Sequence, residues 1–176
     1  MRLKTIFLSF IAVLGLCLLF TPVKDAYAEE IIEKPTILFF DENDNQIFPY
    51  SEEEIEQMFQ EHQDKQDIIP FADWSIYSFG RTTFRNNIWI GGGSSTVFYN
   101  PGTIHLESAQ ETNPITVNAY TGGNKAGSVY INGGWIGGVH IPFTHLARGK
   151  SYSFELVNES TYTAVFDKGQ VWYNGK

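Results

Sequence analysis

Four oxygen-bearing side chains near the N-terminus have the spacing of a calcium-binding loop. Asp41, Asn43, Asn45 and Glu52 fall at positions 1, 3, 5 and 12 of an EF-hand-like loop, where their oxygen atoms would coordinate Ca²⁺. The sixth position of such a loop needs glycine for its sharp turn, and here it is Gln46. A plain polar hairpin explains the same residues. We therefore expect no metal and no other cofactor, and keep calcium as the weaker alternative.

The other groups that could do chemistry form no specific pattern. Gly93-Ser94-Ser95 lacks the second glycine of a nucleophile elbow, and the few acidic residues after position 74 suggest no particular pair for glycoside hydrolysis. The histidines lack zinc-binding spacing and have no cysteine partner after position 28. These histidines are His62, His105, His140 and His145. We therefore expect a protein that is not an enzyme.

Aromatic residues beside glycine-rich turns are the best candidates for binding. Trp135 lies between the glycine pairs Gly133-Gly134 and Gly137-Gly138, which offer no side chain to cover an indole ring. We therefore expect Trp135 to be exposed and to bind a ligand, with Tyr130 and Trp89 as further candidates. The alternative is that these rings fill the core of a domain that has no disulfide bonds.

These candidate residues lie in a segment with the pattern of short strands. From Trp74 onward, apolar residues alternate with polar ones, and glycine- and asparagine-rich turns separate the alternating runs. The clearest run is 151–157, in which Tyr152, Phe154 and Leu156 alternate with small or charged residues. This pattern predicts a mainly β fold, an antiparallel β-sandwich or barrel, over residues 74–176.

Residues 29–73 differ from the rest in composition. They contain 14 acidic and 2 basic residues and no glycine, whereas residues 74–176 contain 5 acidic and 7 basic residues. We expect a hairpin at 36–48 and then a short acidic helix over 51–63. Ser51 and Glu54 form a capping box, and an apolar stripe of Ile55, Met58 and Phe59 would dock the helix on the β domain. Residues 63–70 have the composition of a linker.

Residues 1–28 have the three parts of a secretory signal peptide. Arg2 and Lys4 precede an apolar run from Ile6 to Phe20, and Ala26-Tyr27-Ala28 suits signal peptidase. The run is too short to span a membrane, so we expect cleavage before Glu29 and no membrane association afterwards. Cys17, the only cysteine, lies inside the run and lacks a lipoprotein context. These features predict a secreted, extracellular protein.

The charge balance excludes one class of partner. The chain has 20 acidic and 12 basic residues, a formal net charge of −8, and no basic stripe that could neutralise the phosphates of nucleic acid. We therefore expect an exported small β-sandwich with a non-catalytic binding role at or outside the cell surface, its partner being a glycan, the cell wall or a protein. The alternatives are a secreted structural or matrix protein that self-associates, and an exported enzyme of unknown reaction.

Overall fold

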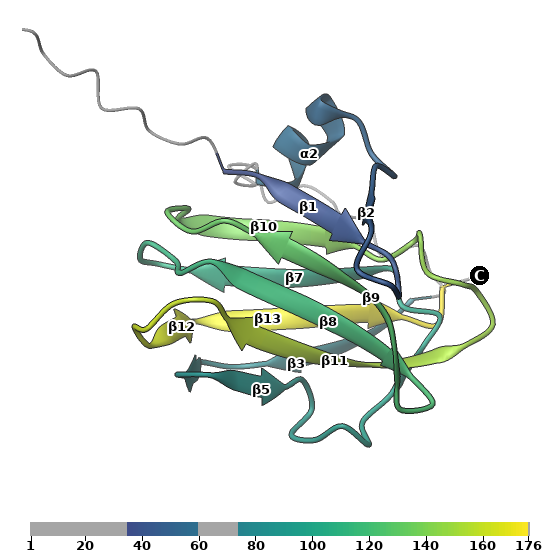
Figure 1. Cartoon of the computed structure of the whole chain (residues 1–176). Coiled ribbons are helices and arrows are strands. Elements are labelled where there is room, and N and C mark those ends of the chain that lie inside the picture. The colour runs from purple at the N-terminus through teal and green to yellow at the C-terminus, as the bar shows by residue number, and fades with distance from the viewer. Residues whose placement is uncertain (1–34, 60–73, 176) are drawn as a thin grey trace, which may run out of the picture. The chain divides into compact units, whose positions relative to one another are not determined.

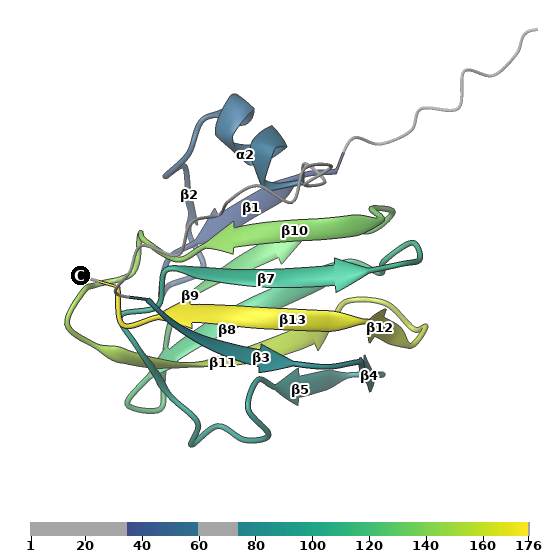
Figure 2. The ribbon, with the colours of Figure 1, turned by 180° about the vertical axis from the view of Figure 1, so that it is seen from behind.

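Two antiparallel sheets pack face to face in the computed structural model, which describes residues 35–59 and 74–175 (Figures 1 and 2). The larger sheet has the strand order β2-β1-β9-β8-β11-β5, with β6 also paired to β11, and the smaller sheet has the order β10-β7-β13-β3. A two-stranded ribbon pairs β12 with β4. The predicted fold class, a mainly β antiparallel sandwich with one short helix, is confirmed.

The strand boundaries follow the alternation of the sequence. In the larger sheet the strands are β1 (Ile37–Phe40), β2 (Gln46–Ile47), β5 (Asn87–Trp89), β6 (Phe98–Tyr99), β8 (Ile115–Thr121), β9 (Asn124–Ile131) and β11 (Ser151–Asn158). In the smaller sheet they are β3 (Ser75–Phe79), β7 (Thr103–Ser108), β10 (Gly137–Pro142) and β13 (Lys168–Tyr173), and the ribbon consists of β4 (Thr82–Phe84) and β12 (Ala164–Phe166).

A single apolar core fills the space between the two sheets. Tyr152, Phe154 and Leu156 of β11 are each at most 2% exposed, as the alternation predicts, while Glu155 between them points away from the core and is half-buried. The smaller sheet contributes its own inward row, for example Ile104 and Leu106 of β7. Burying one such row from each sheet is what holds two amphipathic sheets together.

The acidic N-terminal segment supplies a strand to the larger sheet. β1 runs antiparallel to β9, with Phe39 opposite Val129, and both side chains are buried in the core. The predicted hairpin is formed by β1 and β2, with Phe39 paired to Ile47. Residues on both sides of the compositional boundary near residue 73 therefore share one sheet and one core. The boundary marks only a change in charge and glycine content.

Helix α2 (Glu52–Met58) begins where the sequence predicts and ends earlier. Glu54 N donates to Ser51 Oγ over 3.3 Å and Ser51 N donates to Glu54 Oε2 over 2.8 Å, which completes the capping box. Met58 is 7% exposed, and Ile55 and Phe59 pack against the core, so the helix is docked. The predicted end at residue 63 is wrong, because the helix ends at Met58 and Phe59 is its C-cap.

Some sequence predictions concern residues outside the described ranges. The signal peptide at 1–28, its cleavage before Glu29, Cys17, the linker at 63–70 and His62 all belong to this group. Within residues 35–59 and 74–175, no helix combines the length and the apolar character needed to cross a bilayer.

Candidate binding face

The outward-pointing side chains of the larger sheet form a mixed aromatic and polar surface, which we call the outer face. One register row crosses five strands, pairing Trp89 with Glu155, Glu155 with Asn118, Asn118 with Ser128, and Ser128 with Phe40. Most of their neighbours along the strands are core residues, for example Phe39, Val117 and Phe154, so the two-residue period of a strand directs this row to the opposite side. The outer face comprises Leu38, Phe40, Asn87, Trp89, Thr116, Asn118, Tyr120, Lys125, Ser128, Tyr130, Glu155 and Glu159, with Asp44 of the β1–β2 turn at its rim.

This face is hollowed over β1, β9 and β8. The hollow has a volume of about 580 Å³, within the usual range for small-ligand sites. Apolar walls from Leu38, Phe40 and Tyr130 meet polar groups from Asn118 and Glu159. In Figure 1 the sheet lies in front of the smaller sheet and no described element covers its outer side.

Glu155 is the centre of a hydrogen-bond network on the outer face. Its Oε1 accepts from Asn87 Nδ2 over 2.5 Å, and its Oε2 accepts from Asn118 Nδ2 over 3.3 Å and from the Tyr120 hydroxyl over 3.2 Å. The three donors come from β5 and β8, the strands on either side of β11. One carboxylate therefore holds two amides and a phenol in fixed positions, and all four side chains belong to the outer face.

Two aromatic rings lie together at the β5 end of this network. The Trp89 and Tyr120 ring centroids are 5.2 Å apart with a 47° angle between the planes. Partial burial, together with the nearby charge of Glu155, raises the pKa of the Tyr120 phenol, which therefore stays a hydroxyl donor at neutral pH. Trp89 is half-buried, so part of its indole remains accessible to a ligand.

Two further polar pairs line the hollow. Thr116 Oγ1 donates to Glu159 Oε1 over 2.6 Å. Lys125 Nζ forms an ion pair with Asp44, which ties the start of β9 to the turn between β1 and β2. The Tyr130 ring lines the hollow beside these groups, opposite Thr116 in the register of β8 and β9.

The structure places two of the three predicted binding residues on the same face. Tyr130 and Trp89 both belong to the outer face, at its two ends. Sequence reasoning missed Asn118, Tyr120 and Glu155. The usable signal was the run 115–121, in which Thr116, Asn118 and Tyr120 alternate with three buried apolar residues, because such a strand presents a polar face as regularly as an apolar one.

The prediction that Trp135 is exposed is wrong. Its side chain is 3% exposed, stacks on Phe166 with ring centroids 6.1 Å apart, and lies 6.3 Å from the ring of Phe59. The covering residues come from β12 and from the end of α2, far away in the sequence.

Two of the glycines around Trp135 lie where a side chain would not fit. A Cβ on Gly133 would lie 2.7 Å from the carbonyl oxygen of Thr112, and one on Gly138 would lie 2.8 Å from the His105 ring. Gly133 therefore lets the backbone approach Thr112, and Gly138 leaves room on β10 for the His105 ring. Because its ring is buried, Trp135 is no longer a candidate binding residue.

The Asp41 loop is organised as a hairpin turn. Asp41 Oδ1 accepts from the backbone N–H of Asn43 over 2.9 Å and of Asn45 over 2.8 Å, and the Asn45 side chain also donates to this carboxylate. These hydrogen bonds, those from Asn45 above all, lower the pKa of Asp41. Glu52 instead begins helix α2. In the described ranges, no three His, Cys, Asp or Glu side chains are grouped so that they could hold a metal ion.

The three histidines of the described ranges occupy two separate places. His105 and His140 are cross-strand partners on β7 and β10 with ring centroids 4.3 Å apart. His145 follows β10 and packs between Phe39 and Phe143, at 5.4 and 5.9 Å between ring centroids. This burial lowers the pKa of His145 to about 4, so the ring is neutral at physiological pH.

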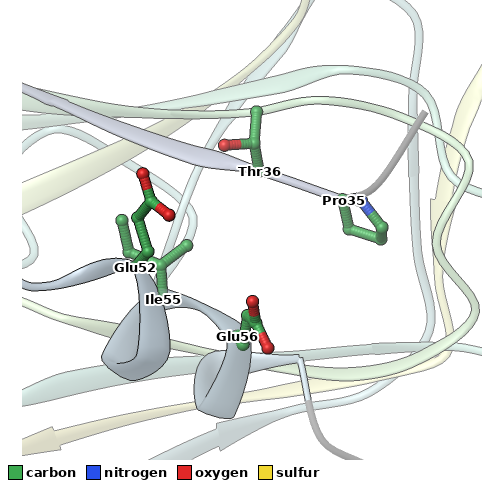
Figure 3. Close-up of a pocket in the computed structure, with 5 residues that line it drawn as sticks. All are labelled: Pro35, Thr36, Glu52, Ile55 and Glu56. Atoms are coloured by element: carbon green, nitrogen blue, oxygen red, sulfur yellow. The ribbon is translucent and has the colours of Figure 1, made fainter.

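One further hollow lies outside this face, and another adjoins its edge at Phe40 and Lys125. One of about 230 Å³ lies between α2 and the start of β1, where Glu52, Ile55 and Glu56 of the helix face Pro35 and Thr36 (Figure 3). The other, about 470 Å³, is lined by His145 and Tyr152 among others. The first is smaller than usual ligand sites and has no aromatic lining, and the second has no polar network comparable to that of Glu155.

Comparison of the chain with protein-family models, with curated proteins and with solved structures gave no match.

Proposed function

We propose that this protein is an exported, non-catalytic binding protein that takes a glycan on the outer face of its larger sheet. The observation that carries the proposal is the combination of accessible aromatic rings at both ends of the face with the Glu155 network between them.

The chemistry of the outer face suits a sugar. A pyranose ring has an apolar face of C–H groups, which packs on an aromatic ring, and an edge of hydroxyls, which donate and accept hydrogen bonds. Trp89 and Tyr130 offer the rings, while Asn118, Thr116 and Glu155 offer donors and acceptors between them. A surface of this kind can bind a sugar without breaking any of its covalent bonds.

The rigidity of the outer face favours binding. Its polar side chains are tied to one another across three neighbouring strands, so little conformational freedom remains to be lost when a ligand is bound. Export agrees with this role, because the signal-peptide pattern at 1–28 would bring the protein to extracellular polysaccharides.

Isothermal titration calorimetry against a panel of soluble oligosaccharides tests the proposal, together with pull-down on insoluble cell-wall polysaccharides. Trp89→Ala and Tyr130→Ala should each weaken binding at least tenfold, the size expected for an aromatic residue central to a binding site. Trp172→Ala is the matched control, because Trp172 is also half-buried but lies on β13 of the other sheet.

Three results would contradict the proposal. The first is that no glycan binds, and the second is that both outer-face variants keep the affinity of the unmodified protein. The third is that Trp172→Ala loses as much affinity as the outer-face variants. Light scattering over a range of concentrations tests the alternative of self-association. If the protein self-associates, the measured molecular mass should rise with protein concentration in the absence of glycan.

A further inference from the structure

We infer that the outer face selects a neutral oligosaccharide lying across the strands, and that it discriminates against glycans carrying carboxylate, sulfate or phosphate groups. This inference rests on the proposed function, for which it names the ligand class.

The direction and length of the ligand follow from the strand register. The row from Trp89 on β5 to Phe40 on β1 crosses four strand intervals, about 19 Å at roughly 4.8 Å each. Aromatic rings mark both ends, with Trp89 and Tyr120 at one and Phe40 and Tyr130 at the other. A single sugar ring would cover only one end, so the arrangement fits several sugar units laid perpendicular to the strands.

The formal charge of the outer face is negative. Among the described residues that form it, Asp44, Glu155 and Glu159 carry three carboxylates and Lys125 carries one ammonium group, a net formal charge of −2. Lys125 is paired with Asp44 at the rim. Glu155 and Glu159 form no ion pair with a lysine, arginine or histidine in the described part of the chain.

Neutral groups hold these two carboxylates in place. Glu155 accepts from two amides and a phenol, and Glu159 accepts from the hydroxyl of Thr116. Neutral donors fix the geometry of a carboxylate without cancelling its charge. The carboxylates can still accept hydrogen bonds from sugar hydroxyls, but they repel an anionic substituent placed at the same point.

The size of the discrimination can be estimated. One like-charge contact near 5 Å at a solvated surface lowers affinity by about tenfold, and added salt reduces this effect. A glycan of several units carrying one negative charge per unit should meet both carboxylates. We therefore expect at least a tenfold preference for the neutral form at low salt.

The experiment compares two forms of the same oligosaccharide. Calorimetry with cellohexaose, laminarihexaose, maltohexaose and mannohexaose identifies the best neutral ligand. Each of the four is also oxidised at its C6 hydroxyls to uronates and titrated again, at low and high salt. Glu159→Gln and the double variant Glu155→Gln/Glu159→Gln are titrated with both forms, and Glu107→Gln on β7 of the smaller sheet is the control.

The inference is supported if the protein binds the neutral form at least tenfold more tightly than the oxidised form. This ratio of affinities should fall below threefold in the double variant and stay unchanged in Glu107→Gln. Glu159→Gln alone should reduce the ratio, and because Glu159 is exposed this variant should fold even if the double variant does not. Equal or tighter binding of the oxidised form overturns the inference and leaves the proposed function standing. Absence of binding by all four neutral hexasaccharides and the oxidised forms contradicts both.

Discussion

Trp135 offers the clearest test of the packing, because its local sequence and its surroundings predict opposite results for Trp135→Ala. A tryptophan side chain presents roughly 150–250 Å² of surface, and only 3% of this residue is exposed. At about 25 cal/mol per Å², burying that surface contributes about 4–6 kcal/mol.

Two effects reduce the net cost of removing the ring. The indole Nε1 of Trp135 is buried and has no hydrogen-bond partner among the described residues, so its removal recovers a desolvation cost of about 1–3 kcal/mol. The remaining methyl group and relaxation of the cavity recover a little more. The expected loss is about 3 kcal/mol, at the low end of the range for core tryptophans.

Urea unfolding followed by far-ultraviolet circular dichroism measures this loss without relying on tryptophan fluorescence. The midpoint should fall while the slope with denaturant stays constant, and the thermal midpoint should drop by about 6–12 °C. Trp89→Ala, at a half-buried position on the outer face, is the control and should cost about 1 kcal/mol. A loss of less than 1 kcal/mol for Trp135→Ala would refute the burial of the ring.

Three further predictions follow from the site and the fold. Because burial holds the pKa of His145 near 4, below the value of about 6.5 in an unfolded chain, the stability from its neutral form is complete above pH 6.5 and is lost as the pH falls toward 4. Since the ring is only half-buried, we expect the free energy of unfolding to fall by about 1–2 kcal/mol across this pH range, as measured by urea unfolding. His145→Phe should flatten this part of the plot of stability against pH. Ser51→Ala should cost α2 about 1 kcal/mol, seen as faster amide hydrogen exchange in the helix alone; unchanged exchange would mean that the cap contributes nothing. Gly102→Ala would place a Cβ 2.1 Å from the indole of Trp74 and should lower stability by about 1–3 kcal/mol in thermal melts. Gly93→Ala should not, because its Cβ would lie 3.8 Å from Ser95 Oγ, an ordinary contact distance.

Local sequence determined the parts of this protein that depend on neighbours within a few residues. The capping box at Ser51 and Glu54 needs only a spacing of three, and it forms as predicted. The strand 151–158 needs only its two-residue alternation, which separates Phe154 from Glu155 whichever strands lie beside it. Fold class follows from many such segments, since short amphipathic strands bury their apolar sides by pairing two sheets.

The larger errors arise where the outcome depends on distant residues. Two glycine pairs around Trp135 suggested exposure because nothing nearby could cover the ring. The cover comes from Phe166 and Phe59, and Gly133 lies where the backbone passes close to the carbonyl oxygen of Thr112. Local composition cannot specify what a distant strand places opposite an indole.

The outer face also depends on tertiary structure. Its members extend from Leu38 to Glu159 in the sequence, and they meet only because β1, β9, β8, β11 and β5 pair in that order and register. Sequence alternation alone shows that Asn118 and Glu155 point away from the core. Strand pairing decides that they point to the same patch, because a shift of one residue in either ladder would turn one of them inward.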